Sequence, residues 1–456
     1  MAEVLNRVIE KAIRGSAPAQ INVPRDYWTQ VIDIELPPIV RLERQGGGTE
    51  AIDKAAKLLS NAKFPVILSG AGVVIGGAIE ETKKLAEKLD SPVCSGYQHN
   101  DSFPGSHPLA VGPLGYNGSK AAMELISKAD VVLALGTRLN PFSTLPGYGI
   151  DYWPKTASII QVDMNPDRIG LTKKVTVGIS GDAKLVASQI LKKLSSNAGD
   201  TDRQKRKDLI HQTKSAWLQK LSSLDHEDDD EGTVWNKEAR KRDKDRMSPR
   251  QAWRAIQAGM PEDVIISSDI GNNCAIGNAY PTFEKPRKYL APGLFGPCGY
   301  GFPSILGAKI GCPDTPVIGF AGDGAFGISM NEMSSCAREE WPAITMVIFR
   351  NYQWGAEKRN TTLWFDNNFV GTELDPELSY AKVANACGLK GVTVKTMEET
   401  TAAIKQSCED QKTGITTFIE VILNQELGEP FRRDAMKKPV RVAGIKKEDM
   451  KKQPSL

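Results

Sequence analysis

The sequence predicts an α/β protein with two doubly wound parallel-sheet domains and an N-terminal remnant of a third domain. Short apolar runs alternate with helical patterns in two separate stretches, residues 41–195 and 248–425, and such alternation is typical of parallel sheets with helices on both faces. A charged stretch, residues 196–247, separates the two. The length of 456 residues fits about three domains.

The composition restricts the classes of function. Lysine and arginine exceed aspartate and glutamate by 58 − 55 = 3, so the net charge gives no argument for nucleic acid or an anionic membrane as a partner, and we expect neither. No apolar run approaches the ~18 residues of a membrane helix. The seven cysteines are scattered and never spaced CxxC, which indicates a reduced, cytoplasmic protein without structural zinc.

The N-terminal stretch, residues 1–40, is too short to close a core. Residues 1–14 place their apolar side chains on one helical face, and residues 19–23 look like a short strand before a Pro- and Gly-containing linker. Two interpretations remain open. The stretch is either the end of a domain whose beginning is missing or an arm that packs on the first complete domain.

The first complete domain, residues 41–195, contains Ser69-Gly70-Ala71-Gly72 directly after a predicted strand. This loop could cradle a phosphate, but no GxGxxG with a later acidic partner is present, so we favour a structural domain without a nucleotide. The elements predicted here are helices at 51–59, 79–89 and 121–127 and strands at 65–68, 92–94, 131–135 and 158–162.

The charged stretch combines an acidic run at 225–231 with a mainly basic run at 237–246, and we predict a solvated helix and linker. Order resumes at Ser248, a predicted helix N-cap followed by Pro249. The second domain then carries predicted strands at 264–267, 316–320, 345–349 and 417–421. A basic tail, residues 426–456, either covers another part of the protein or is partly disordered.

The segment that carries chemistry is an aspartate between two glycines, Asp323, directly after a predicted strand. Asn351 follows the next predicted strand, 351 − 323 = 28 residues later. Both side chains would therefore lie at the carboxyl ends of parallel strands, where open α/β sheets bind ligands. Carboxylate and amide oxygens suit Mg²⁺, and the N–H groups of a helix start suit a diphosphate. The cofactor-binding residues predicted in this segment are Gly322, Asp323, Gly324, Ala325 and Asn351.

This arrangement resembles the GDG…N fingerprint of the thiamine diphosphate enzymes. Residues 293–301 resemble the loop that supports the bent cofactor in that family, although Cys298 stands where a bulky apolar side chain is usual. Residues 269–273 resemble the loop that contacts the diphosphate. The resemblance implies thiamine diphosphate and Mg²⁺ as cofactors. It adds Gly271, Asn272, Asn273, Gly296 and Cys298 to the cofactor site, and it implies Asp323, Asn351 and the backbone carbonyl of Gln353 as metal ligands.

Within that family, residues 49–194 resemble the middle domain of the acetolactate synthase and oxalyl-CoA decarboxylase group. Residues 352–374, 293–311 and 425–435 resemble the sulfoacetaldehyde acetyltransferases of taurine degradation. This resemblance implies conversion of sulfoacetaldehyde and phosphate to acetyl phosphate and sulfite. The alternatives are a related acetolactate synthase or 2-oxoacid decarboxylase, the cofactor-binding large chain of a split enzyme, and a nucleotide-binding structural protein built on the loop at 70–72.

Two anionic groups, a sulfonate and a phosphate, would need cationic partners. The candidates are Lys358, Arg359, Arg432 and Arg433; each is otherwise a solvated surface charge. The resemblance further implies a catalytic glutamate from an N-terminal pyrimidine-binding domain, usually of a partner subunit, and hence a homodimer or homotetramer. Residues 1–40 would be the remnant of that domain. We therefore expect an N-terminally truncated member that keeps the cofactor site and turns over poorly or not at all alone.

Overall fold

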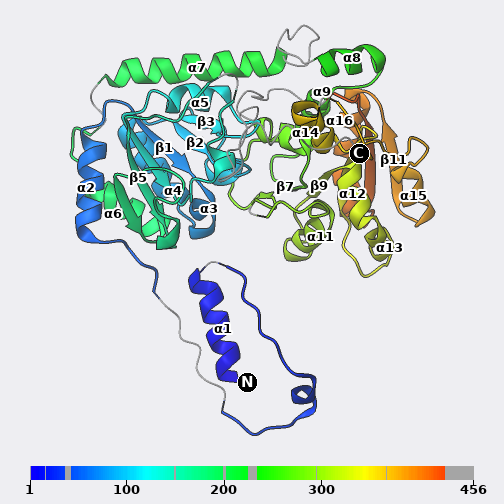
Figure 1. Cartoon of the computed structure of the whole chain (residues 1–456), viewed down its shortest axis with the longest axis horizontal. Helices are drawn as coiled ribbons and strands as arrows, with labels where there is room; N and C mark the ends of the chain where they lie inside the picture. The colour runs from blue at the N-terminus through cyan, green and yellow to red at the C-terminus, as the bar shows by residue number, and fades with distance from the viewer. Residues whose placement is uncertain are drawn as a thin grey trace.

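The computed structural model describes residues 2–15, 17–35, 43–147, 150–198, 202–223, 234–293, 295–365 and 367–426. Two six-stranded sheets, each with all its pairings parallel, form two α/β domains side by side (Figure 1). The predicted fold class is confirmed. None of the described helices is long and apolar enough to cross a membrane.

The first domain has the strand order β3-β2-β1-β4-β5-β6. Its central strands β1 and β4 are buried along their whole length because helices cover both faces. All four predicted strands and all three predicted helices are present. The elements are α2 (Thr49–Ser60), β1 (Pro65–Ser69), α3 (Ala71–Gly76), α4 (Ile79–Leu89), β2 (Val93–Ser95), β3 (Ala110–Pro113), α5 (Lys120–Ile126), β4 (Val131–Leu135), β5 (Ser158–Asp163), β6 (Val177–Ser180) and α6 (Ala183–Lys193).

The second domain has the order β11-β12-β10-β9-β7-β8. The predicted N-cap is confirmed: Ser248 and Gln251 form a capping box at the start of α9. All four predicted strands are present as well. The elements are α9 (Pro249–Gly259), β7 (Ile265–Ser268), α10 (Asn272–Ile276), β8 (Tyr289–Leu290), α11 (Gly301–Gly311), β9 (Val317–Gly322), α12 (Asp323–Ser329), α13 (Met333–Cys336), β10 (Thr345–Arg350), α14 (Gly355–Trp364), α15 (Tyr380–Ala386), β11 (Lys390–Val394), α16 (Met397–Lys412) and β12 (Thr417–Ile422).

Two helices occupy the charged stretch between the domains, α7 (Arg203–Ser223) and α8 (Val234–Arg242). The long helix α7 lies over the first domain at the top of Figure 1. It is more than a solvated connection, because Arg206 and Trp217 are buried and Arg206 donates hydrogen bonds to main-chain carbonyls of the first domain. The acidic run at 225–231 lies outside the described residues.

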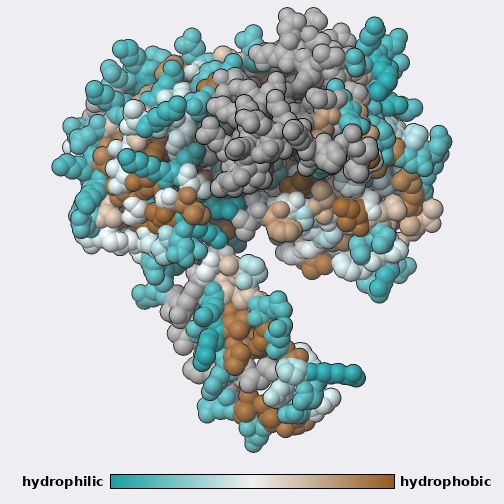
Figure 2. Space-filling model, viewed as in Figure 1, coloured by the Kyte–Doolittle hydropathy of each residue, from teal (hydrophilic) through white to brown (hydrophobic). Residues whose placement is uncertain are grey.

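The N-terminal segment keeps its apolar side chains exposed. The helix α1 (Ala2–Gly15) is present as predicted, but its residues Val4, Leu5 and Ile9 are 44–49% exposed, and brown apolar side chains line this segment in Figure 2. The predicted strand at 19–23 is wrong. No strand of the described chain lies beside it to form a ladder, and an extended segment without such a partner is not a strand.

The two domains are joined by hydrogen bonds between the segment 98–106 and the segment 278–289. The amide of Asn100 donates to the carbonyls of Asn278 at 2.9 Å and Pro281 at 2.8 Å, and the carboxylate of Asp101 accepts from the backbone N–H of Lys288 at 2.9 Å. These contacts hold the first domain beside the edge strand β8.

Candidate functional site

The carboxyl ends of β9 and β10 bring together the two residues that the sequence pairs. The strands run parallel, with Phe349 opposite Gly322, so Asp323 and Asn351 follow directly at the same edge. The backbone N–H of Asn351 donates to Oδ2 of Asp323 at 3.1 Å. Both side chains are buried, 1% and 3% exposed. An aspartate and an asparagine thus meet at the edge where parallel sheets bind ligands.

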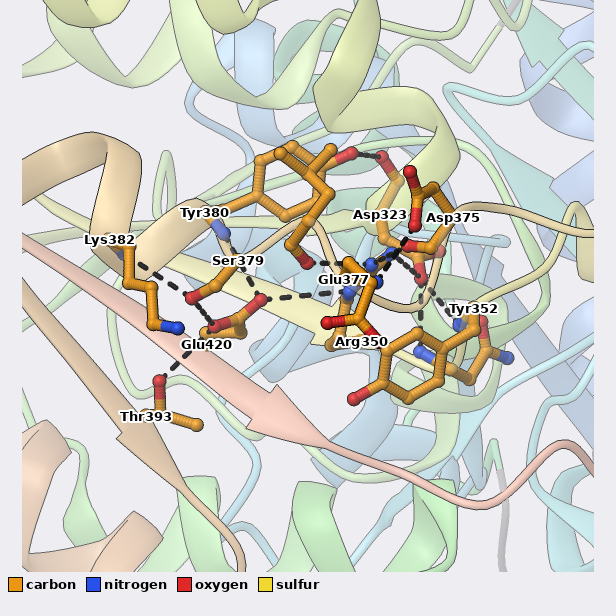
Figure 3. A network of polar contacts seen from close by, with 12 residues as sticks. Asp323, Arg350, Tyr352, Asp375, Glu377, Ser379, Tyr380, Lys382, Thr393 and Glu420 are labelled. Atoms are coloured by element: carbon orange, nitrogen blue, oxygen red, sulfur yellow. Dashed lines mark hydrogen bonds and ion pairs between the residues drawn. The ribbon is translucent and has the colours of Figure 1, made fainter.

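The carboxylate of Asp323 has an asymmetric set of donors. Its Oδ2 accepts from Nη1 of Arg350 at 3.1 Å and from the N–H of Tyr352 at 2.6 Å, besides the bond from Asn351, as Figure 3 shows. Within the described part of the chain, its Oδ1 accepts only from Gly324 N–H, at 3.0 Å. Burial raises the pKa of Asp323 to about 6, while the charge of Arg350 opposes this rise.

Amide side chains converge beside this carboxylate. A Cβ built on Gly355 would lie 3.5 Å from Nδ2 of Asn272, 3.7 Å from Nε2 of Gln353 and 3.8 Å from Nδ2 of Asn351. The buried Oε1 of Gln353 and Oδ1 of Asn273 have no hydrogen-bond partner among the residues that the structure describes. A carboxylate at the same edge as amide side chains with unpaired oxygens offers a donor set that fits Mg²⁺, which completes its shell with phosphate oxygens and water. The described residues contain no group of three His, Cys, Asp or Glu that could hold a metal.

The two loops assigned by resemblance lie together at this edge, tied by Asp269. Its Oδ1 accepts from the N–H of Gly299 at 3.1 Å, and its Oδ2 accepts from the N–H of Gly301 at 2.7 Å. One carboxylate at the end of β7 therefore fixes the loop 293–301 against the loop 269–273.

Within these loops, glycine serves positions with positive φ. Gly271 has φ +138° and Gly296 has φ +68°, a region that side-chain-bearing residues rarely adopt. Asn272 and Asn273 begin α10 and are buried, and Asn272 donates to the carbonyl of Gly355 at 2.8 Å. Cys298 is exposed.

The packing of Trp354 requires a glycine at position 324. A Cβ at this position would lie 2.8 Å from the ring of Trp354. The indole therefore covers the start of α12, where Ala325 is also buried. At Gly322 a Cβ would meet nothing within 4 Å, so packing does not explain that glycine.

The four candidate cations differ in their surroundings. Lys358 is 1% exposed and forms an ion pair with Glu373, whose side chain is 58% exposed, so a carboxylate of the same chain balances its charge. Arg359 is half-buried on α14, with its guanidinium 5.3 Å from the ring centroid of Tyr116 in the first domain. Arg432 and Arg433 lie outside the described residues.

Three residues at the site were not predicted: Arg350, Tyr380 and Glu420. Tyr380 donates from its hydroxyl to the carbonyl of Asp323 at 2.8 Å, and Glu420 lies on β12 with its carboxylate 3.7 Å from Nε of Arg350. The only signal in the sequence is the arginine itself. It ends the otherwise apolar strand β10 directly before Asn351, and a buried charge requires a partner.

The glycine loop of the first domain has a packing explanation. A Cβ on Gly70 would lie 2.6 Å from the carbonyl oxygen of Gly136, and one on Gly72 would lie 2.7 Å from Cα of Gly136. The two glycines let α3 begin in contact with the end of β4. This accounts for the motif without a bound phosphate.

Models of two protein domains match this chain: "Thiamine pyrophosphate enzyme, central domain" over residues 52–190 and "Thiamine pyrophosphate enzyme, C-terminal TPP binding domain" over residues 269–421. The chain is 78% identical over 451 residues to the "Probable sulfoacetaldehyde acetyltransferase" of Rhizobium meliloti, covering 99% of this chain and 76% of that protein. The chain belongs to the sulfoacetaldehyde acetyltransferase family of thiamine pyrophosphate enzymes. Thiamine pyrophosphate and thiamine diphosphate are the same cofactor.

Other relatives agree with this family. The sulfoacetaldehyde acetyltransferase of Roseovarius nubinhibens is 74% identical, with 99% of this chain and 75% of that protein covered. The probable acetolactate synthase large subunit of Methanococcus aeolicus is only 30% identical, with 89% and 67% covered. Benzoylformate decarboxylase from Polynucleobacter necessarius shares the fold, with a TM-score of 0.66 at 19% identity over 89% of this chain and 70% of that chain.

Proposed function

We propose that this chain acts as a sulfoacetaldehyde acetyltransferase, which converts sulfoacetaldehyde and phosphate to acetyl phosphate and sulfite with thiamine diphosphate and Mg²⁺. The observation that carries the cofactor assignment is the contact of Asp323 with Asn351 at the ends of adjacent strands. The substrate assignment is supported by relatives of that name at 46–78% identity. An acetolactate synthase-type reaction is the alternative, supported by relatives at 28–30% identity.

The residues of this chain have distinct roles in the proposal. Asp323, Asn351 and the backbone carbonyl of Gln353 would hold Mg²⁺, while Gly324 and Ala325 at the start of α12 would line the diphosphate site. When bound, thiamine diphosphate supplies the electron sink that cleavage of the carbon–sulfur bond requires. The protein supplies position and charge, because the metal ligands are buried and the loops around them are tied by hydrogen bonds.

Arg359 is the anion-binding candidate that we propose for the sulfonate or phosphate. Its guanidinium lies one helical turn beyond the converging amides and next to the first domain, 5.3 Å from the ring centroid of Tyr116. A guanidinium presents donors in a fork that suits both anions. If the role is correct, Arg359→Met raises the KM for one of the two substrates and leaves cofactor binding unchanged.

Thermal-shift titration tests the cofactor assignment. Thiamine diphosphate with Mg²⁺ should stabilise the chain by about 2.7 kcal/mol at 100-fold saturation, and Asp323→Asn should abolish this stabilisation because a metal ligand loses its charge. Absence of any stabilisation of the unaltered chain would contradict the assignment. A response to ADP or FAD alone would favour the nucleotide-binding alternative.

Turnover distinguishes the remaining alternatives. Acetyl phosphate formed from sulfoacetaldehyde and phosphate supports the proposed reaction, whereas acetolactate formed from pyruvate supports the alternative. Turnover by the 456-residue chain alone, compared with turnover after addition of a separately expressed pyrimidine-binding domain, tests whether a catalytic glutamate must be supplied by another chain. Robust turnover without the added domain would contradict that expectation.

We also propose that the protein is cytoplasmic and a homodimer or homotetramer. All seven cysteines are free, which is usual in a reducing compartment. Phe295, in the loop beside the cofactor site, is 93% exposed, and large apolar side chains of this kind are often covered in oligomers. Light scattering after size-exclusion chromatography measures the oligomeric state, and a monomer at micromolar concentration would contradict this part of the proposal.

A further inference from the structure

A buried arginine stands directly behind the proposed metal ligand. Arg350 is the last residue of β10 and is 0% exposed. Its Nη1 donates to Oδ2 of Asp323 at 3.1 Å. Its Nη2 donates to the main-chain carbonyls of Asp375 and Leu378, the latter at 2.8 Å. The guanidinium is therefore anchored to the backbone on the side away from Asp323.

The remaining sides of the guanidinium are also fixed. The rings of Tyr352 and Tyr380 lie with their centroids 4.2 and 5.4 Å from its central carbon, and the carboxylate of Glu420 lies 3.7 Å from Nε. Glu420 is held in turn by Ser379 and Thr393, as Figure 3 shows. Arg350 therefore has two carboxylate neighbours, and its Nη1 and Nη2 are held by hydrogen bonds, whereas its buried Nε has no hydrogen-bond partner among the residues that the structure describes.

The two oxygens of Asp323 differ in the number of donors that they meet. Oδ2 accepts three hydrogen bonds, from Arg350, Asn351 and Tyr352, whereas Oδ1 accepts one from the described residues. A carboxylate oxygen has two lone pairs, so Oδ2 is saturated and Oδ1 keeps acceptor capacity. Rotation of the carboxylate would break the charge-assisted bond to the guanidinium, which is among the stronger hydrogen bonds in proteins.

We propose that Arg350 is a positioning residue for the metal: it holds the Asp323 carboxylate in one rotamer so that Oδ1 is presented to Mg²⁺. Glu420 helps to balance the positive charge of the Arg350 guanidinium inside the domain. The proposal rests on the Mg²⁺ and diphosphate site described above. It assigns a role to a residue pair, Arg350 and Glu420, that lies behind the proposed metal ligand. Partners behind metal ligands typically change metal affinity by about 10–100-fold when removed.

The test measures the Mg²⁺ concentration that gives half-maximal binding of thiamine diphosphate, followed by calorimetry of the full chain. Arg350→Met removes the guanidinium, and Arg350→Lys keeps the charge but loses the fork. We expect both to raise the half-saturating Mg²⁺ concentration about 10-fold or more. Arg206→Met serves as the matched control because Arg206 is also buried but lies in α7, against the first domain. It should lower the melting temperature while leaving the Mg²⁺ requirement within about twofold, since it lies outside the shell around the metal ligands.

The possible outcomes separate this proposal from the cofactor assignment. If the unaltered chain shows no Mg²⁺-dependent binding of thiamine diphosphate, the cofactor assignment fails and the role of Arg350 fails with it. If the unaltered chain binds and a folded Arg350 variant has the same Mg²⁺ requirement, only the positioning role is overturned. Arg350→Lys keeps the test decisive if Arg350→Met does not fold.

Discussion

At the residue scale, the proposed cofactor site depends on close packing of side chains against the backbone as well as on metal ligands. Trp354 lies over the first turn of α12, where only a glycine leaves room for the indole. The same stretch of backbone presents the N–H groups assigned to the diphosphate. One residue thus meets a packing requirement and a binding requirement together, which explains why Gly324 is more restricted than Gly322.

Gly324→Ala is therefore expected to destabilise the protein and to weaken cofactor binding. The added Cβ meets the indole at 2.8 Å, and overpacking of this kind typically costs about 1–3 kcal/mol. The measurement is urea unfolding with and without thiamine diphosphate and Mg²⁺. Gly307→Ala is the control, since a Cβ in that part of α11 meets nothing within 4 Å and alanine should stabilise the helix by about 0.4–1 kcal/mol. Equal effects of the two substitutions would contradict the packing argument.

At the element scale, α7 is attached to the first domain through a buried guanidinium. Arg206 donates from Nη1 to the carbonyl of Lys63 at 2.8 Å, and from Nη2 and Nε to those of Leu89 and Asp90 at 3.0 Å each. Leu89 and Asp90 lie at the end of α4, where helix carbonyls lack partners within the helix. A side chain of α7 thereby caps the carboxyl-terminal end of α4.

We expect Arg206→Met to lower the free energy of unfolding by about 1–3 kcal/mol for each buried carbonyl left without a donor. Increased hydrogen exchange at the end of α4 and along α7 would locate the effect. Lys205→Met, an exposed position next to it on the same helix, is the control and should change stability by less than about 0.5 kcal/mol. If both variants have wild-type stability, the attachment does not depend on this arginine.

The strands that sequence reasoning found and missed differ in one physical respect. The eight correctly predicted strands are recognisable as apolar runs, as in β1 and β4, where every residue is buried. The four missed strands, β3, β6, β8 and β11, are the edges of the two sheets. An edge strand packs against one neighbour and carries fewer apolar residues; β11 has only one buried residue. Its pairing depends on a strand that is distant in sequence.

The residues of the candidate site also divide into those that the sequence could predict and those that it could not. Asp323 and Asn351 could be predicted because each directly follows an apolar strand, and parallel strands present their carboxyl ends at one edge. Glu420 could not, since it lies within an apolar strand, 420 − 351 = 69 residues beyond Asn351, and nothing local indicates that it faces Arg350. Lys358 is a candidate for an incoming anion on sequence grounds, but the fold places Glu373 against it.

At the scale of the whole molecule, a half-buried imidazole makes stability depend on pH. His99 lies in the first domain near the junction with the second. Burial, and secondarily the charge of Arg138, lowers the pKa of His99 to about 4, whereas an unfolded histidine titrates near about 6.5. At this histidine, the unfolded chain binds more protons than the folded chain between these values, so the contribution of His99 to the free energy of unfolding falls as the pH falls from about 6.5 toward 4.

His99→Asn removes this titration. We expect the melting temperature of the unaltered chain to decrease more steeply than that of the variant between about pH 6.5 and pH 4.5, and the two profiles to run parallel above about pH 7. Differential scanning fluorimetry across this range provides the comparison. Parallel profiles throughout would mean that His99 is protonated equally in the folded and unfolded chains.

Local sequence patterns were enough to establish the two parallel-sheet domains, the strands of their interiors, and the pairing of Asp323 with Asn351. These features depend on short apolar runs and on the geometry of parallel strands. The fold alone settled which partners the buried arginines meet: the carboxylates of Asp323 and Glu420 for Arg350, and the main-chain carbonyls at the end of α4 for Arg206. Such contacts join residues that are distant in the chain, and their strength depends on the exclusion of water around both partners. No local sequence pattern indicates where water is excluded.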